Sequence, residues 1–550
     1  MSKTAAYPLS ARLAELFADS PLRHKTFRMF YFGTIAAALG YMMQATLAAW
    51  VMATLTTSPL MVALVQTAST APALVIGLVA GTMADLVDRR LLILVNMIVL
   101  GLATLIMGAL SVAGLLNPGL LLFLTVIVGA AFTFYMPAQS ASVNEFVARD
   151  ELPRAIALSS VAYNVARAIG PALAGALAAI MTSGSAILIS AVFFAIMIVS
   201  LRFWVSPERT LPGIPETLFS GALSGLRYAR HSIAMRTLII RSLTFSICAA
   251  ALWALLPVIA RDQLHLGAGG YGILFTGFGI GAVVGALAIP QQLEKKSLNY
   301  IVTSGVVLWT VAMLLIAATE LLALALLGTA CAGMAWVSVN SSISTGLQSS
   351  APAWVRARAV AINLISVQAS LAAGSVIWGT VASAFGTHIA LALSAGMLLL
   401  LHLLNRHVRV RMGSEADVTP GAKLPTLSVI DEPDPEDGPV LIQIEYKIEP
   451  EQRAEFLRLI QRVEPIRRRN GASSWRVFRD LAEEGCFVER YVLESWADYV
   501  RARGRMTVTD RTLVSEVEAQ QKADIPIRVS RFLGVNPRTA SLHMTGATSI

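Results

Sequence analysis

Hydrophobic residues along this chain fall into twelve long runs that are separated by shorter polar segments. Most runs reach or approach the roughly 20 residues with which an α-helix crosses a bilayer. Only helices and closed barrels satisfy all their backbone groups in lipid, and these runs are too long for barrel strands. The pattern therefore predicts an all-α polytopic membrane protein. We place its helices at 29–55, 60–84, 91–116, 119–143, 155–181, 185–201, 242–260, 270–293, 298–319, 321–347, 359–383 and 386–405.

An internal repeat divides these runs into two six-helix halves. At a constant offset of 204 residues, segment 155–178 aligns with 359–382, which places Gly170 on Gly374 and Gly175 on Gly379. A duplicated half predicts two bundles related by an axis along the membrane normal, with a substrate site between them near the midplane. The repeat therefore favours a transporter, although apolar, Ala-rich helices also align loosely by chance.

Positively charged residues mark one set of loops. The N-terminal segment and the loops after the even-numbered runs hold almost all of them, whereas Arg261 stands alone in the opposite set. Because Lys and Arg accumulate on the cytoplasmic side, we expect both termini and the central loop in the cytoplasm and the protein in the plasma (inner) membrane. The formal net charge of +9 then reflects loop orientation, and we expect no nucleic-acid partner.

The composition and the missing motifs argue against several kinds of chemistry on this chain. Charged residues make up 14% of the chain, against roughly 25% in an ordinary soluble domain. The three cysteines lie far apart without a CxxC pair, and the sequence contains no GxxxxGK[ST] nucleotide loop. We therefore expect no metal site, no cofactor and no ATP-driven step on this chain. The expected partners are the lipid bilayer and a small-molecule substrate.

The loop between the second and third runs carries spaced charges. It reads Gly81-Thr-Met-Ala-Asp85-Leu-Val-Asp-Arg89-Arg90 and resembles the signature loop of the major facilitator superfamily. Gly81 would permit close helix contact, and Asp85 at a helix end would pair with basic groups to latch the cytoplasmic face, which makes these four residues a gating loop. A charged turn that merely follows the positive-inside rule is the alternative.

Further motifs narrow the resemblance. The segment from Pro137 to Glu145, together with several later stretches, is similar to an exporter subfamily, the transmembrane secretion effectors related to the enterobactin exporter. This resemblance implies a proton-coupled exporter of small organic molecules. Gln139 and Asn144 stand where that subfamily is expected to carry a bulky residue and a proline, so its substrate preferences do not carry over.

The fifth run contains a Gly-Pro motif, Gly170-Pro171 followed by Gly175. A proline inside a helix removes a backbone hydrogen bond and kinks the helix, while glycines allow tight packing. In the superfamily that the chain resembles, such a motif in helix 5 is associated with export by antiport, and the coupling ion is expected to be H+. A packing kink without directional meaning remains the alternative.

Arg167 is the most informative single residue. It lies about 12 residues into the fifth run, hence ~18 Å from its start, near the midplane, where an unpaired Arg is costly. It either faces the central cavity and binds an anionic or catecholate-like substrate, or is satisfied by neighbouring carbonyls and amides as a structural element. Carboxylates near the midplane, which would carry protons, are lacking. The candidates for the substrate cavity are Gln44, Gln139, Asn164, Arg167 and Gln368.

The composition changes abruptly after the last run. Residues 406–439 are rich in Pro, Gly and acidic residues and predict a flexible linker. Residues 440–534 then show the order β-α-β-β-α-β, which is ferredoxin-like. This region resembles the dimeric α+β barrels of the antibiotic-biosynthesis monooxygenase type, which implies possible dimerisation. Trp475, Tyr491 and Trp496 either line an aromatic pocket or, more simply, form core or dimer interface.

The sequence thus predicts seven regions and one leading function. We expect a secondary active transporter that exports siderophore- or drug-like molecules by alternating access and is not itself an enzyme. Uptake, or a transporter fused to a ligand-sensing or monooxygenase-like domain, remains an alternative. The regions are an N-terminal segment (1–28), a first bundle (29–201), a central loop (202–241), a second bundle (242–405), the linker (406–439), the α+β domain (440–534) and a disordered tail (535–550).

Overall fold

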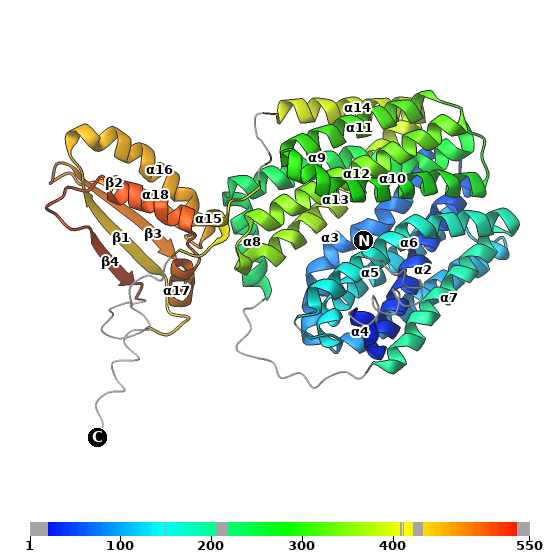
Figure 1. Ribbon diagram of the computed structural model, residues 1–550, viewed down its shortest axis with the longest axis horizontal. Helices are drawn as coiled ribbons and strands as arrows, with labels where there is room; N and C mark the ends of the chain where they lie inside the picture. The colour runs from blue at the N-terminus through cyan, green and yellow to red at the C-terminus, as the bar shows by residue number, and fades with distance from the viewer. Residues whose placement is uncertain are drawn as a thin grey trace, which may run out of the picture. The chain divides into compact units, whose positions relative to one another are not determined.

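The computed structural model describes residues 20–148, 150–204, 218–406, 410, 412–421 and 433–535 (Figure 1). Most of the predicted N-terminal segment, nearly all of the predicted tail and part of the predicted linker lie outside these residues. The chain divides into two compact units. The first comprises Met1–Ile214, Arg241–Ser342 and Leu364–Val408; the second comprises Pro215–Ile240, Ile343–Asn363 and Arg409–Ile550.

Twelve helices in the described part of the chain are long and apolar enough to cross a membrane, which confirms the predicted number. Large apolar side chains cover their outer surfaces, such as Val75 and Ile180, each 78% exposed. Such exposure is expected where lipid replaces water. The helices are α2 (Lys25–Leu55), α3 (Pro59–Leu86), α4 (Arg89–Val112), α5 (Pro118–Ser142), α6 (Leu152–Ile180), α7 (Ser183–Ser200), α9 (Ile233–Val258), α10 (Ala268–Lys295), α11 (Leu298–Ala318), α12 (Leu322–Ser350), α13 (Ala353–Phe385) and α14 (Thr387–Leu404).

Side-chain caps and prolines fix several helix starts. Asp88 accepts a hydrogen bond from the backbone N–H of Leu91 at 3.1 Å, and Asn117 caps α5 in the same way. Pro59 and Pro118 occupy first helical positions, where a missing N–H costs nothing. Short helices complete the list: η1 (Pro21–Arg23), η2 (Val143–Glu145), η3 (Leu201–Phe203), the π-helical η4 (Ile259–Gln263), α15 (Glu415–Val418) and η5 (Pro450–Gln452).

The central loop is more helical than predicted. Helix α8 spans Leu218–His231, and α9 begins at Ile233 rather than near 242. Two arginines mask this start in the hydropathy pattern. The side chain of Arg241 is nonetheless buried, because it donates hydrogen bonds to the Asn405 carbonyl at 2.6 Å and to the ring of His402 at 2.8 Å. The predicted loop 202–241 is therefore wrong in its second half.

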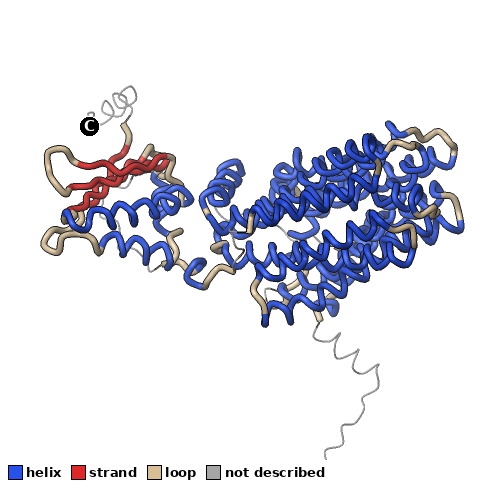
Figure 2. Tube along the Cα trace, turned by 90° about the horizontal axis from the view of Figure 1, so that it is seen from above, coloured by secondary structure: helices blue, strands red, loops and turns tan. Residues whose placement is uncertain are grey.

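The C-terminal domain contains one four-stranded antiparallel sheet with helices on one face (Figure 2). The strands follow the order β2-β3-β1-β4, and alternate residues of β1, from Val440 to Tyr446, are buried against the helices. On the opposite face, Phe478 and Phe532 are 44% and 49% exposed. The elements are β1 (Val440–Lys447), α16 (Arg453–Arg469), β2 (Ser474–Arg479), β3 (Cys486–Leu493), α17 (Trp496–Gly504), α18 (Val508–Glu518) and β4 (Arg528–Leu533).

One predicted helix of this domain is in fact two. The predicted order β-α-β-β-α-β has a single helix before the last strand, but the structure has two there, since α17 ends at Gly504 and α18 begins at Val508. Thr507 caps the second helix, accepting from the N–H of Asp510, while the Asp510 carboxylate accepts from the N–H of Thr507. This reciprocal capping box starts a new helix, and the apolar periodicity on either side hides the break.

Candidate functional site

The repeated glycines lie at equivalent helix crossings in the two halves. A Cβ atom at Gly170 on α6 would lie 2.6 Å from the Cβ of Met42 on α2. Its partner in the repeat, Gly374 on α13, is packed as tightly against Ile247 and Ala250 of α9. Because α9 stands in the second half where α2 stands in the first, the glycine register found in the sequence corresponds to equivalent packing.

A second pair of glycines brings the two halves into contact. We call the face where α2 begins the first face and the face where α2 ends the second face. Near the second face, a Cβ at Gly175 of α6 would lie 2.7 Å from the Cα of Gly272 of α10. A Cβ at Gly272 would in turn lie 2.9 Å from the carbonyl oxygen of Pro171. The Gly-Pro motif therefore forms the α6–α10 interface between the halves.

Polar contacts close the same face between other helices. The Thr67 hydroxyl of α3 donates to the Ala372 carbonyl of α13 at 3.0 Å, and the backbone N–H of Leu60 donates to the Ser383 hydroxyl at 3.0 Å. Arg261 donates to the Thr56 carbonyl at 2.8 Å. This residue is the isolated Arg of the second-face loops, and that isolation was the signal that could have singled it out. Together these contacts hold the halves together at the second face.

Towards the first face, side chains of α6 and α10 become exposed. Gly279 still packs against Ala168, since a Cβ there would lie 2.8 Å from the Ala168 Cα. One turn further, Asn164 on α6 and Val283 on α10 are both exposed. Asn164, one of the predicted cavity residues, is therefore exposed one turn beyond the contact between Ala168 and Gly279.

Arg167 lies one turn from Asn164 and rests on an aromatic side chain. Its guanidinium carbon is 5.0 Å from the centroid of the Tyr163 ring, and the residue is half-buried. Among the described residues, no carboxylate forms an ion pair with it. Nearby in the same half, Tyr41 of α2 stacks on Phe132 of α5 with a centroid distance of 3.7 Å. A half-buried cation beside aromatic rings suits an anionic, aromatic ligand.

The other predicted cavity residues have different surroundings. Gln44 is fully buried within the first half, where its amide lies 3.5 Å from the Met107 sulfur. Gln139 is also buried, while Gln368 on α13 is half-buried. Asn164 and Arg167 are therefore brought together in accessible positions, and Gln44 packs between helices instead.

The second half contains an aromatic cluster that the sequence reading missed. Trp253 of α9 contacts Phe278 at 4.7 Å and Trp336 at 5.4 Å between ring centroids. The indole N–H of Trp253 is buried without a hydrogen-bond partner among the described residues. Tyr271 extends the cluster to the first half by stacking on Trp50. Helical spacing hides such a cluster, because its members come from four helices.

The loop between α3 and α4, predicted to be a gating loop, is anchored by an ion pair. Arg89 donates to the Glu145 carboxylate at 2.9 Å and to the Ala141 and Ala84 carbonyls, and both charged side chains are largely buried. The side chain of Asp85, the predicted partner, lies outside the described residues. Among the described residues, no atom lies within 4 Å of a Cβ placed at Gly81, so the role of this glycine stays a prediction. The latch therefore joins the start of α4 to the end of α5.

We expect neutralising this ion pair to weaken both folding and transport. In Arg89→Ala the Glu145 carboxylate loses its charged partner, which costs about 1–3 kcal/mol for a buried polar group. We predict a lower thermal midpoint in detergent and slower transport, with partial recovery in the exchanged pair Arg89→Glu/Glu145→Arg. The matched control is Arg90→Ala on the same helix. Equal losses in Arg89→Ala and Arg90→Ala would contradict a specific role for the pair.

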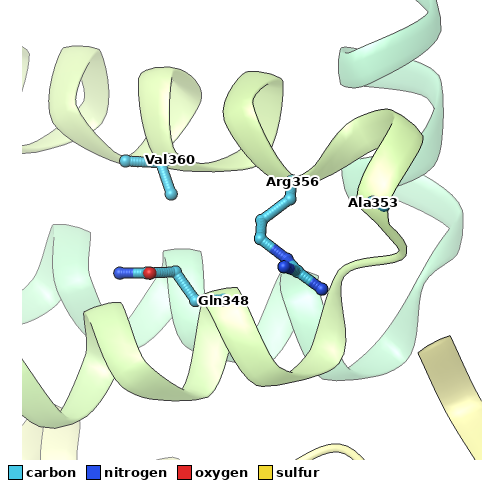
Figure 3. Close-up of a pocket in the computed structure, with 4 residues that line it drawn as sticks. All are labelled: Gln348, Ala353, Arg356 and Val360. Carbon is cyan, nitrogen blue, oxygen red and sulfur yellow. The ribbon is translucent and has the colours of Figure 1, made fainter. Parts of the chain in front are cut away.

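One surface hollow lies between α12 and α13. It has a volume of about 510 Å³ and is lined by Gln348, Ala353, Arg356 and Val360. Figure 3 shows Gln348 from α12 and Arg356 from α13 reaching towards the space between the two helices. Arg356 also donates to the Ala351 carbonyl at 3.2 Å. No predicted cavity residue lines the hollow, so we do not assign it to the transport site.

The aromatic residues of the C-terminal domain form core rather than a pocket. Trp496 is 5% exposed and packs on Tyr499, while the Trp475 indole donates to buried Glu489 at 2.9 Å. Burial raises the pKa of Tyr491 to about 12, so its hydroxyl stays protonated at neutral pH. Across the described residues, His, Cys, Asp and Glu form no group of three that would hold a metal. These aromatic side chains therefore pack against the core of the domain.

Comparison with known proteins agrees with this architecture. The chain is 26% identical over 359 residues to the multidrug efflux pump Tap of Mycolicibacterium fortuitum, covering 62% of this chain and 86% of that protein. An MFS-type transporter of Sinorhizobium fredii is 24% identical over 287 residues, covering 51% of this chain and 69% of that protein. Both similarities are to membrane transporters.

Solved structures show the same fold. A bacterial homologue of the lysosomal transporter Spinster has a TM-score of 0.60 at 13% identity, covering 72% of this chain and 99% of that one. The nucleoside transporter NupG, as its D323A mutant, has a TM-score of 0.58 at 14% identity, covering 70% and 99%. Residues 17–539 match the family described as transmembrane secretion effector. The chain is therefore a membrane transporter of the major facilitator superfamily and belongs to the transmembrane secretion effector family.

Proposed function

We propose that this transporter exports aromatic organic anions, of siderophore or drug type, from the cytoplasm by alternating access. The observation that carries the proposal is the Arg167 guanidinium on the Tyr163 ring, one turn from the exposed side chain of Asn164. Charge favours an anion there, and the rings of Tyr163, Tyr41 and Phe132 offer stacking surfaces. The aromatic cluster around Trp253 would supply the apolar wall from the second half.

The conformation supports access from the first face. The contacts at Gly175, Thr67 and Arg261 hold the halves together at the second face, while Asn164 is exposed towards the first. The basic residues of the N-terminal segment and of the loops at the first face favour a cytoplasmic position for that face. We infer that this is the cytoplasm-open state, in which an export substrate enters.

Export by H+ antiport is the coupling we propose. Similarity to a multidrug efflux pump supports the direction, and the Gly-Pro motif at the interface between the halves agrees with it. Glu145 is a largely buried carboxylate at the first face and pairs with Arg89, so it is our candidate for the proton-responsive group. In Glu145→Gln we expect transport to lose its dependence on a pH gradient.

The test is efflux from proteoliposomes. Purified protein is reconstituted, and vesicles are loaded with a catecholate anion, its neutral methylated analogue or a cationic dye, with and without an imposed pH gradient. We expect gradient-dependent loss of the catecholate and little movement of the cation. Gradient-driven accumulation of the catecholate would favour uptake instead. If every compound leaves the vesicles at the same rate with and without the pH gradient, antiport is refuted.

We propose a ferredoxin-like fold and a regulatory role for the C-terminal domain. The antiparallel order β2-β3-β1-β4 with helices on one face supports this fold. The opposite face of its sheet, with Phe478 and Phe532 exposed, is the surface through which two copies would pair as a dimer. The packed core around Trp496 favours regulation over a monooxygenase-like reaction. Oxygen consumption by the purified protein in the presence of quinols would overturn this assignment.

A further inference from the structure

An arginine–aromatic cluster joins the C-terminal domain to two other segments of the second unit. We call this cluster the clasp and define it as Arg227, Tyr228, Trp354, Arg469 and Arg505. Arg227 and Tyr228 lie on α8 in the central loop, and Trp354 lies in the first turn of α13. Arg469 and Arg505 belong to the C-terminal domain. Three segments that are distant in the sequence therefore meet within one compact unit.

Trp354 is enclosed from two sides. The guanidinium carbon of Arg505 lies 4.0 Å from the centroid of its ring. Tyr228 meets the same ring edge-on, with a centroid distance of 5.5 Å and an interplanar angle of 88°. Both geometries are favourable for aromatic rings, one as a cation–π contact and one as a T-shaped pair. Trp354 is therefore the centre of the clasp.

Arg469 and Arg227 connect α8 to the C-terminal domain. Arg469 lies over the Tyr228 ring at 5.6 Å and forms an ion pair with Asp510, the capping residue of α18. Arg227 donates to the Gly471 carbonyl at 3.2 Å and lies 3.4 Å from the Glu494 carboxylate. Tyr228 is only 3% exposed as a result. The domain thus covers α8 with charged groups whose positions are fixed by its own fold.

The segments that the clasp joins are parts of the transport machinery. Helix α8 belongs to the connection between the two six-helix halves. Helix α13 carries Trp354 at its start, and further along the same helix Ala372 and Ser383 make the second-face contacts with α3. With 33 residues, α13 is about 50 Å long. A restraint at its first turn therefore acts on a helix that must change its contacts during alternating access.

We propose that the clasp is an autoinhibitory contact. It holds the transporter in the cytoplasm-open state and slows its conversion to the state that is open at the second face. This inference rests on the transport function proposed above. A cation–π contact changes an equilibrium about twofold at an exposed site and about thirtyfold at a desolvated one, so loss of the contacts of the half-buried Trp354 is expected to raise the transport rate about three- to tenfold. Release of the domain from α8 and α13 is the event that would switch the transporter on.

The first experiment separates docking from transport. Full-length protein in nanodiscs carries Arg505→Ala, Trp354→Leu or both, and hydrogen–deuterium exchange of 218–231 reports docking on α8. We expect faster exchange in each variant. The double variant should exchange no faster than the stronger single variant, because both single substitutions remove the same contact between Arg505 and Trp354. The control is Arg501→Ala, which removes only an ion pair to Asp498 within the domain. Unchanged exchange in all three clasp variants overturns the clasp itself, whatever the transport assay shows.

The second experiment tests whether the clasp slows transport or speeds it. Arg505→Cys/Trp354→Cys is joined by a bismaleimide with a cleavable disulfide, in a background with Cys331→Ala. Efflux should fall at least fivefold on cross-linking and recover on reduction, while the released variants exceed the unmodified protein. Unchanged efflux in the cross-linked protein, or slower efflux in the released variants, overturns autoinhibition. If the unmodified protein moves no compound, the proposed function fails, whereas the exchange result for the clasp still stands.

Discussion

Replacing Gly272 by leucine is expected to lower transport by about a hundredfold without unfolding the protein. Its Cα faces Gly175, and a side chain there would meet the Pro171 carbonyl at 2.9 Å and the Gly175 Cα at 2.7 Å. These are backbone atoms, which cannot rotate away as a side chain would. Overpacking of this kind costs roughly 1–3 kcal/mol, and each 1.4 kcal/mol is about tenfold. The cost falls only on the state in which the second face is closed.

The measurement combines efflux with accessibility. A cysteine at Thr67, near the second-face contact with Ala372, is labelled by an impermeant maleimide. In Gly272→Leu we expect faster labelling from the second face and slower efflux, because the equilibrium moves to the state that is open there. The matched control is Gly267→Ala at the start of α10, where a Cβ meets no atom within 4 Å. Normal efflux in Gly272→Leu would show that the α6–α10 contact is not a gate.

Removing the charge of Arg167 should raise the KM for an aromatic anion about ten- to a hundredfold. Hydrogen bonds to charged groups contribute roughly 1.5–3 kcal/mol, and the half-buried Arg167 guanidinium, which lies on the Tyr163 ring, is the group proposed to make them. Arg167→Lys keeps the charge but loses the planar group that lies on the ring, so its effect should be smaller, about threefold to tenfold.

The control compares ligands as well as variants. A neutral methylated analogue should be transported by Arg167→Ala as by the unmodified protein, since only the anion needs the cation. Arg154→Ala, near the start of the same helix, serves as the matched variant. If Arg167→Ala slows the neutral analogue as strongly as the anion, Arg167 is a structural element of α6 rather than a substrate ligand. The sequence left both roles open. The effect of Arg167→Ala on transport of the anion, relative to its effect on the neutral analogue, decides between them.

Much of the membrane architecture follows from the sequence alone. Lipid offers no partner for backbone groups, so a long apolar run must be a helix, and twelve runs gave twelve helices. The repeat also placed Gly170 and Gly374 at equivalent crossings, because only glycine permits such an approach at both positions. In the C-terminal domain, the alternating apolar residues of β1 in the same way indicate a strand with one buried face, which the structure shows.

What only the tertiary structure decided is which side chains meet. The partner of Arg89 is Glu145 on another helix, and spacing along the loop could not reveal this because the pair is separated by 56 residues. The aromatic cluster around Trp253 and the clasp around Trp354 are likewise assembled from distant segments. Helix formation is a local consequence of burial in lipid, whereas sites and gates depend on contacts between helices, and these are fixed only when the helices pack.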